Sequence, residues 1–220
     1  MTLDSCCSGA APLLDWSKLK CFGWTTVSGG SGTPLHEIAK SIGEPVPPRP
    51  DRPITRELKT LRKCEAENGS LSSILGRAEF PLHTDCAYYR QPPSYILFRA
   101  MRPSSVSTIF VDGDSVLKVC DSRILTALFR VRGLRKHFLC KMVSGNALRW
   151  DTNCMFPADL WAKEAAAEFA TRSAEANPIR FQWEDTTTIL ILDNRRMLHG
   201  RESAVRDPRR HLESVLVQAG

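Results

Sequence analysis

Three side chains that bind metals stand out in this sequence of 220 residues. His83 and Asp85 are separated by one residue, and His199 lies far downstream. Residues i and i+2 of a strand point to the same face, so this imidazole and this carboxylate can chelate one ion. Two imidazoles and one carboxylate that leave other coordination positions open are the donor set of non-haem Fe(II) oxygenases. The pattern therefore predicts an Fe(II) site.

An isolated His-x-Asp is common by chance, and a single histidine such as His199 is often only structural. The downstream sequence strengthens the prediction, because His199 follows the apolar run TTTILILD, so a strand end can present it. Arg210 then follows His199. A guanidinium binds a carboxylate through a planar, charge-assisted pair. We therefore expect Arg210 to hold the carboxylate of a co-substrate, with the neighbouring Arg209 as the competing choice.

Three stretches of the chain resemble the TauD/TfdA (taurine-dioxygenase-like, clavaminate-synthase-like) family of Fe(II)/2-oxoglutarate-dependent oxygenases. The similarity extends from about residue 20 to the C-terminus. The matching stretches are FPLHTD (80–85), STIFVDG (107–113) and LDNRRMLHGRESAVRDPRRHL (192–212).

The resemblance implies that His83, Asp85 and His199 bind Fe(II). It also implies that Arg210 and Thr108 hold the distal carboxylate of 2-oxoglutarate, with O₂ as the other co-substrate. The implied reaction is hydroxylation of an unactivated C–H bond of a small polar substrate, an amino acid or a natural-product intermediate, with CO₂ and succinate as co-products. In related halogenases the carboxylate position is Ala or Gly, so Asp85 favours hydroxylation over halogenation.

Candidates for substrate contact lie near the expected metal ligands in the sequence. They are Cys86, Tyr88, Arg149, Trp150, Asn194 and Arg195. Arg149 and Arg195 are the candidate anchors for a substrate carboxylate, although Arg149 and Asp151 can instead form a structural ion pair. Ser214 replaces the second arginine of the family's Arg-x-Leu-x-Arg pattern, which serves a sulfonate there. A sulfonate substrate is therefore not expected.

The pattern of apolar runs predicts a mainly β fold with helical insertions. Many short strand-like runs with turn signals favour a double-stranded β-helix, the jelly roll of cupin-like proteins, whose ends can hold a metal site. We expect one catalytic domain over 1–220, with a helix-containing segment at about 1–53 and a core at about 54–220. Helices are predicted at 34–45, 121–131 and 157–177, and 70–75 is predicted as a strand.

Composition limits the class of partner. Hydrophobic residues make up 42% and charged residues 25%, as in an ordinary globular protein. The chain has no apolar run long enough to cross a bilayer and no basic leader, so we expect a cytoplasmic protein. The net charge of +6 is scattered. This favours a small zwitterionic or anionic substrate and argues against nucleic acid.

Two alternatives remain open. One is the same chemistry on a macromolecular or carrier-bound substrate. The other is a metal-binding cupin-like module without catalysis, which would have no need of an oxoacid-binding arginine.

Overall fold

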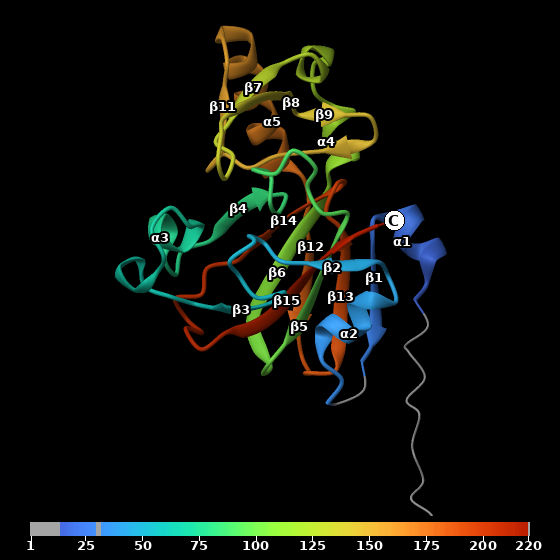
Figure 1. Ribbon diagram of the computed structural model, residues 1–220. Helices are drawn as coiled ribbons and strands as arrows, with labels where there is room; N and C mark the ends of the chain where they lie inside the picture. Colours follow the sequence, from blue (N-terminus) through green and yellow to red (C-terminus); the bar gives the residue numbers. More distant parts are fainter. Residues whose placement is uncertain (1–13, 30–31, 220) are drawn as a thin grey trace, which may run out of the picture.

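Two antiparallel sheets face one another and carry a smaller lobe at one end (Figure 1). The computed structural model describes residues 14–29 and 32–219. In spatial order, the larger sheet contains β1 (Trp24–Ser28), β13 (Thr188–Asp193), β5 (Tyr95–Ala100), β15 (His211–Gln218) and β2 (Glu44–Val46), while β3 (Thr55–Lys59) also pairs with β15. The smaller sheet contains β12 (Ile179–Trp183), β6 (Ser104–Asp112), β14 (Met197–Arg201) and β4 (Phe80–His83).

Apolar side chains fill the space between the two sheets. Phe98 of β5 and Leu190 of β13 belong to one buried cluster with Phe110 and Trp183 of the smaller sheet. The other face of the larger sheet is covered by two helices, α1 (Trp16–Phe22) and α2 (Leu35–Lys40), as seen in Figure 1. Strands such as β13 are therefore buried on both faces, which explains their continuous apolar sequence.

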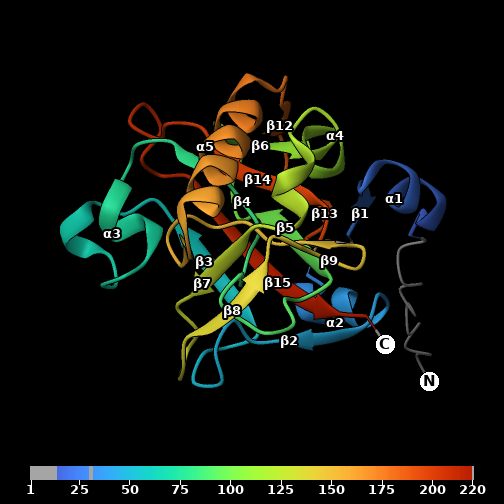
Figure 2. The same ribbon diagram turned by 90° about the horizontal axis from the view of Figure 1, so that it is seen from above.

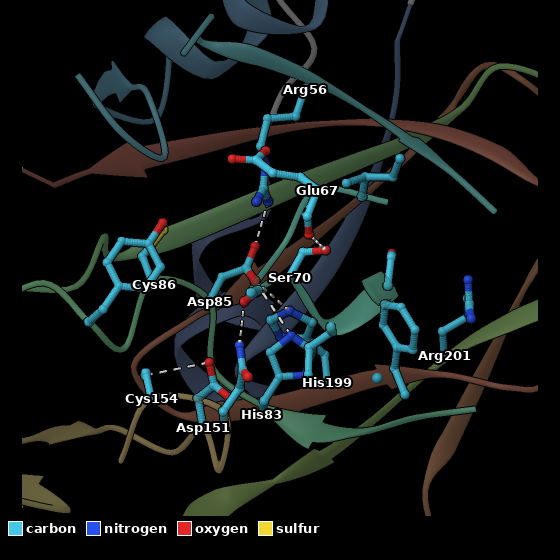
Figure 3. A pocket seen from close by; sticks show the side chains of 18 of the residues that line it. Arg56, Glu67, Ser70, His83, Asp85, Cys86, Asp151, Cys154, His199 and Arg201 are labelled. Atoms are coloured by element: carbon cyan, nitrogen blue, oxygen red, sulfur yellow. Dashed lines mark hydrogen bonds and ion pairs between the residues drawn. The ribbon is translucent and has the colours of Figure 1, made fainter. Parts of the chain in front are cut away.

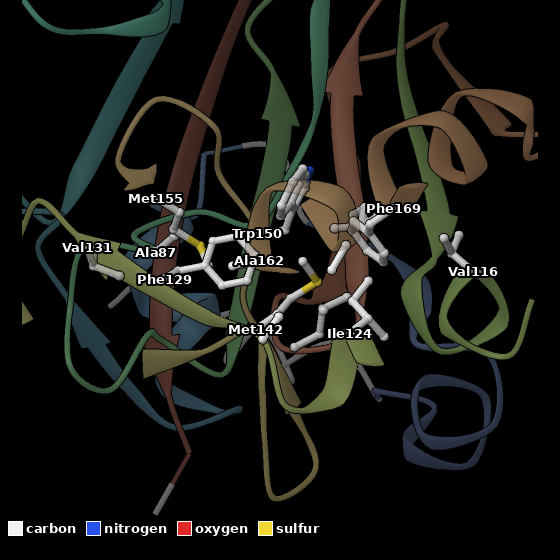
Figure 4. Packing of buried hydrophobic residues seen from close by; sticks show 14 of the residues in the cluster. Ala87, Val116, Ile124, Phe129, Val131, Met142, Trp150, Met155, Ala162 and Phe169 are labelled. Carbon is white, nitrogen blue, oxygen red and sulfur yellow. The ribbon is translucent and has the colours of Figure 1, made fainter. Parts of the chain in front are cut away.

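The lobe is built around a long helix and a three-stranded sheet. Its core packs Trp150 against Phe129 and Phe169 (Figure 4). Its elements are α4 (Gly113–Leu117), η2 (Ser122–Leu125), β7 (Leu128–Val131), β8 (Phe138–Lys141), β9 (Val143–Ser144), β10 (Ala147–Leu148), β11 (Met155–Pro157) and α5 (Leu160–Glu175). A separate segment before β4 contains η1 (Lys63–Glu65) and α3 (Leu71–Leu75), seen beside the sheets in Figure 2.

The predicted mainly β jelly roll is confirmed, and so is the helix at 157–177, which is α5. Within the first 53 residues, β1 and β2 are strands of the larger sheet. The helix predicted at 34–45 is the shorter α2. No helix among the described residues is long and apolar enough to cross a membrane.

Two predicted elements are wrong. The segment 121–131 forms the short η2 followed by β7, because Phe129 and Val131 are buried while Leu128 and Arg130 are exposed. This alternation has the period of a strand. The segment 70–75 forms α3 instead of a strand, because the side chain of Ser70 accepts a hydrogen bond from the amide of Ser73 and caps the helix.

Gly200 allows β14 and β4 to approach closely beside His199. A Cβ atom at this position would lie 2.5 Å from the carbonyl oxygen of Phe80 and 3.2 Å from that of Pro81. Both contacts are with backbone, which cannot move aside as a flexible side chain can. The pairing of the two strands therefore requires glycine here.

We predict that Gly200→Ala lowers the free energy of unfolding by about 1–3 kcal/mol, the usual cost of overpacking. Urea unfolding measures this change. Ser105→Ala, at an exposed position of β6, is the control and should shift the free energy of unfolding by no more than about 0.5 kcal/mol. Equal stability of the two variants would contradict the steric argument.

Candidate metal centre

The pairing of three strands brings two histidines together. His199 of β14 lies opposite His83 of β4 on one side and Phe110 of β6 on the other. The two imidazole centroids are 4.8 Å apart. We expected His83 and Asp85 to lie in one strand. His83 is the last residue of β4, however, and Asp85 lies in the turn that follows. His199 likewise lies within β14 and not at the end of β13.

The three side chains form a compact donor set. The Nε2 atoms of His83 and His199 lie 3.5 Å and 3.9 Å from the same oxygen, Oδ1 of Asp85. All three ligand atoms lie within 4.8 Å of one another (Figure 3). Two imidazole nitrogens and a carboxylate oxygen at this spacing fit a divalent first-row metal such as Fe(II).

Hydrogen bonding prepares one imidazole for metal binding. Nδ1 of His83 lies 2.9 Å from the carbonyl oxygen of Pro81, which can only accept, so Nδ1 carries the proton. The lone pair of Nε2 then faces Asp85, as a metal ligand requires. Nδ1 of His199 is buried and has no hydrogen-bond partner among the described residues. Burial lowers the pKa of His199, which favours the neutral form that metals bind.

Asp85 is held as an anion. Burial alone would raise its pKa, but the positive charge of Arg56 and the two neighbouring imidazoles hold the pKa well below its usual range. The same carboxylate raises the pKa of His83, although burial of that imidazole acts in the opposite direction. The site therefore contains an ionised carboxylate beside two imidazoles, in the form that a divalent cation binds.

Asn194 fixes the backbone of Asp85. Its Oδ1 accepts a hydrogen bond from the Asp85 amide at 2.7 Å, and its Nδ2 donates to the carbonyl oxygens of Asp85 and Pro93, both at 3.0 Å. The next residue, Cys86, has a φ of 59° and is the only described residue other than glycine with a positive φ. Such a conformation needs support from its surroundings, and the contacts of Asn194 supply it.

A buried arginine just before β15 of the larger sheet reaches across to the sheet that carries the two histidines. Arg210 is only 6% exposed, and its guanidinium donates to the carbonyl oxygen of Val106 and, at 2.9 Å, to Oγ1 of Thr108. Oγ1 also accepts from Nε1 of Trp183 at 3.1 Å. A hydroxyl has two acceptor lone pairs, so the O–H of Thr108 remains able to donate. Among the described residues, Arg210 has no carboxylate partner.

An unpaired buried cation is costly, and burial lowers the pKa of Arg210 to about 9. Thr108 lies opposite Arg201 of β14, two residues from His199. The spacing of strand residues therefore places Thr108 about 7 Å along the sheet from the level of His199. A carboxylate between Arg210 and Thr108 would satisfy both groups.

The metal donor set and the Arg210–Thr108 pair line the same pocket, which has a volume of about 930 Å³. Its lining comes from β3, from the segment containing η1 and α3, from the smaller sheet and from the lobe. His83, Asp85, His199, Thr108 and Arg210 all line it. Arg209, the competing choice for the carboxylate arginine, is exposed and does not line this pocket.

The six substrate candidates separate into two groups. Cys86 and Tyr88 line the pocket, and their side chains contact each other at 3.4 Å from Sγ to Oη. Burial raises the pKa of Cys86 to about 12, so its thiol is neutral. The other four candidates do not line the pocket: Arg149, Trp150, Asn194 and Arg195.

These four side chains have structural contacts. Arg149 donates to the carbonyl oxygens of Ala87, Tyr89 and Arg90 and forms no ion pair with Asp151 within the described chain. Trp150 packs in the core of the lobe. Arg195 donates to the carbonyl oxygen of Pro92. Neither cation faces the expected substrate, so the structure leaves Arg149 and Arg195 without the anchoring role that the sequence suggested.

Arg56 and Asp151 line the pocket but were not among the candidates from the sequence. Arg56 pairs with Asp85, and the carboxylate of Asp151 accepts hydrogen bonds only from the Asn153 amide and the Cys154 thiol among described residues. The sequence around Arg56 shows only a strand-like run. The run Arg149-Trp150-Asp151 contains charges of both signs, and nothing in its sequence indicates which of them faces the pocket.

Comparison with known proteins gives similarity of fold without similarity of sequence. No protein-family model and no curated protein matches the chain. Asparagine oxygenase, solved with Fe(II), 2S,3S-3-hydroxyasparagine and succinate, aligns with a TM-score of 0.71 and 16% identity over 89% of this chain and 74% of that one. Non-heme iron oxygenase OrfP, solved with Fe and alpha-ketoglutaric acid, aligns at 0.68 with 19% identity over 90% and 76%.

PvcB from Pseudomonas aeruginosa aligns at a TM-score of 0.67, with 20% identity over 92% of this chain and 78% of that one. The chain therefore has the fold of these solved structures. At such low identity, its chemistry must be argued from its own residues.

We predict that Asn194→Ala lowers the free energy of unfolding by about 2–4 kcal/mol, because it leaves buried backbone groups of Asp85 and Pro93 unpaired. It should also weaken Co(II) binding, because the turn that carries Asp85 loses its support. Urea unfolding and Co(II) titration measure the two effects. Asn177→Ala, at an exposed position after α5, is the control. Unchanged Co(II) affinity in the Asn194 variant would contradict this role.

Proposed function

We propose that the protein is an Fe(II)- and 2-oxoglutarate-dependent oxygenase that hydroxylates a C–H bond of a small amino-acid-like molecule. One observation carries the proposal. The same pocket contains the His83–Asp85–His199 donor set and the buried Arg210–Thr108 pair, which has no carboxylate partner among the described residues. A module that only binds metal needs the first feature and has no use for the second.

The residues divide the binding work between the two ends of a dicarboxylic oxoacid. His83, Asp85 and His199 would hold Fe(II), which, when bound, supplies the oxidising chemistry that activates O₂ and breaks a C–H bond. Arg210 binds the distal carboxylate through a charge-assisted pair, and Thr108 donates its free O–H to the same group. The separation of about 7 Å along the sheet is one that a five-carbon oxoacid can span.

The pocket also supports a zwitterionic substrate. Asp151 presents a carboxylate without an ion-pair partner among the described residues, and Arg132 presents a guanidinium that donates only to the carbonyl oxygen of Asn153. Both line the pocket from the lobe, while Cys86 and Tyr88 line it beside the donor set. Charges of both signs suit an amino acid. Asparagine oxygenase and OrfP, which share the fold, have been solved with hydroxylated amino acids bound.

We predict that Arg210→Gln raises the dissociation constant of 2-oxoglutarate by about 10- to 100-fold, since hydrogen bonds to a charged group contribute about 1.5–3 kcal/mol. Calorimetric titration into the Mn(II)-loaded protein measures this without turnover. Arg209→Gln removes the same charge from the exposed neighbour and should leave the dissociation constant unchanged. Equal effects of the two variants would argue against a specific carboxylate site at Arg210.

The reaction itself is tested by succinate formation. We expect Fe(II), 2-oxoglutarate and O₂ to yield succinate, with a clear increase when the correct amino acid from a panel is added. Asp85→Ala should abolish this signal, because it removes one metal donor, whereas Asp51→Ala at an exposed position should retain it. Metal binding without succinate in any condition would support the non-catalytic alternative.

A further inference from the structure

Arg56 reaches from the larger sheet to the metal centre. It lies on β3 directly opposite Ser214 of β15, and its Nε donates to Oγ of Ser214 at 3.1 Å. Its Nη2 donates to Oδ2 of Asp85 at 2.5 Å (Figure 3). Ser214 is fully buried, so the guanidinium is fixed at one end by the sheet and at the other by the carboxylate.

The two oxygens of Asp85 therefore have different surroundings. Oδ1 faces the Nε2 atoms of His83 and His199, while Oδ2 is occupied by Arg56. A carboxylate that is free on both sides can bind a metal through both oxygens. With Oδ2 engaged by a guanidinium, only Oδ1 is available to an ion between the two imidazoles.

The number of oxygens bound decides how much room is left on the metal. On a six-coordinate ion, three protein donors leave about three positions, and a two-oxygen carboxylate leaves about two. A chelating oxoacid takes two positions, and O₂ needs another. A carboxylate bound through both oxygens would thus compete with one of the co-substrates.

We propose that Arg56 keeps Asp85 a one-oxygen metal ligand and so holds one coordination position open for a co-substrate. Arg56 is a positioning residue in this role, because it acts through Asp85. The inference rests on the metal site of the proposed function. The planar fork of arginine is suited to this task, because it can donate to Ser214 and Asp85 at the same time from fixed directions.

A matched control is the ion pair between Arg99 and Glu213, the residue before Ser214 on β15. Arg99 of β5 lies opposite Glu213, and its guanidinium forms an ion pair with that carboxylate at 2.5 Å. Their side chains are 12% and 11% exposed, as buried as the Arg56 pair or more so. Successive strand residues point to opposite faces, so this pair lies on the other face of the sheet from the metal centre.

The test is the number of waters on bound Mn(II), measured by water-proton relaxation enhancement at saturating protein. We expect Arg56→Gln to bind Mn(II) and to lower the inner-sphere relaxivity by about one third, from about three waters to two. Arg99→Gln should lose stability in urea and keep the wild-type relaxivity. Arg56→Lys and Ser214→Ala retain a positive charge beside Asp85 but lose the simultaneous hydrogen bonds to Ser214 and Asp85. Both variants should give intermediate relaxivities.

The other possible results contradict either the role of Arg56 or the metal site itself. Wild-type relaxivity in Arg56→Gln would overturn the inference, and a raised substrate KM in that variant would then assign Arg56 to substrate binding. Loss of Mn(II) binding in Arg56→Gln would also overturn it, because the carboxylate would need Arg56 in order to bind at all. If Arg56→Gln does not fold, wild-type relaxivity in Ser214→Ala overturns the inference instead. Absence of Mn(II) binding in the wild-type protein would overturn the metal site itself.

Discussion

The antiparallel pairing of β14 with β4 and β6 is the constraint on which the rest of the site depends. This register places His199 opposite His83 and places Thr108 opposite Arg201, so the two candidate metal-binding histidines and the hydroxyl of Thr108 lie on one sheet. Gly200 permits the close approach, since a side chain would collide with the backbone of β4. A shift of register by one residue would turn His199 away from the pocket.

Buried charge explains why the pocket needs ligands. Asp85 is neutralised by Arg56 and faces two imidazoles, whereas within the described part of the chain the buried Arg210 has neutral acceptors only. Leaving a buried ion unpaired costs stability. A carboxylate at Arg210 would remove this cost, and a cation at the donor set would bind the ionised Asp85 and the two imidazoles. We therefore expect metal and oxoacid to stabilise the folded protein, because each binds the native state preferentially.

The sequence predicted the parts of the site that have a fixed chemical pattern. His83, Asp85 and His199 lie together as expected, and Arg210 lies beside Thr108. Substrate contacts were harder to predict, because Arg149 and Arg195 satisfy backbone carbonyls that only the folded chain brings near them. Arg56 gave no local signal, since its partners Asp85 and Ser214 are distant in sequence. The error at 121–131 has a similar origin, because burial in the lobe decided between helix and strand.

The central claim is that one pocket binds a metal and an oxoacid together, and anaerobic titration tests it most directly. Addition of 2-oxoglutarate to the Fe(II)-loaded protein without O₂ should produce a weak visible charge-transfer band that saturates at one equivalent. The band requires chelation of the iron by the keto acid. A protein that is loaded with Fe(II) and shows no band at saturating 2-oxoglutarate would contradict the account.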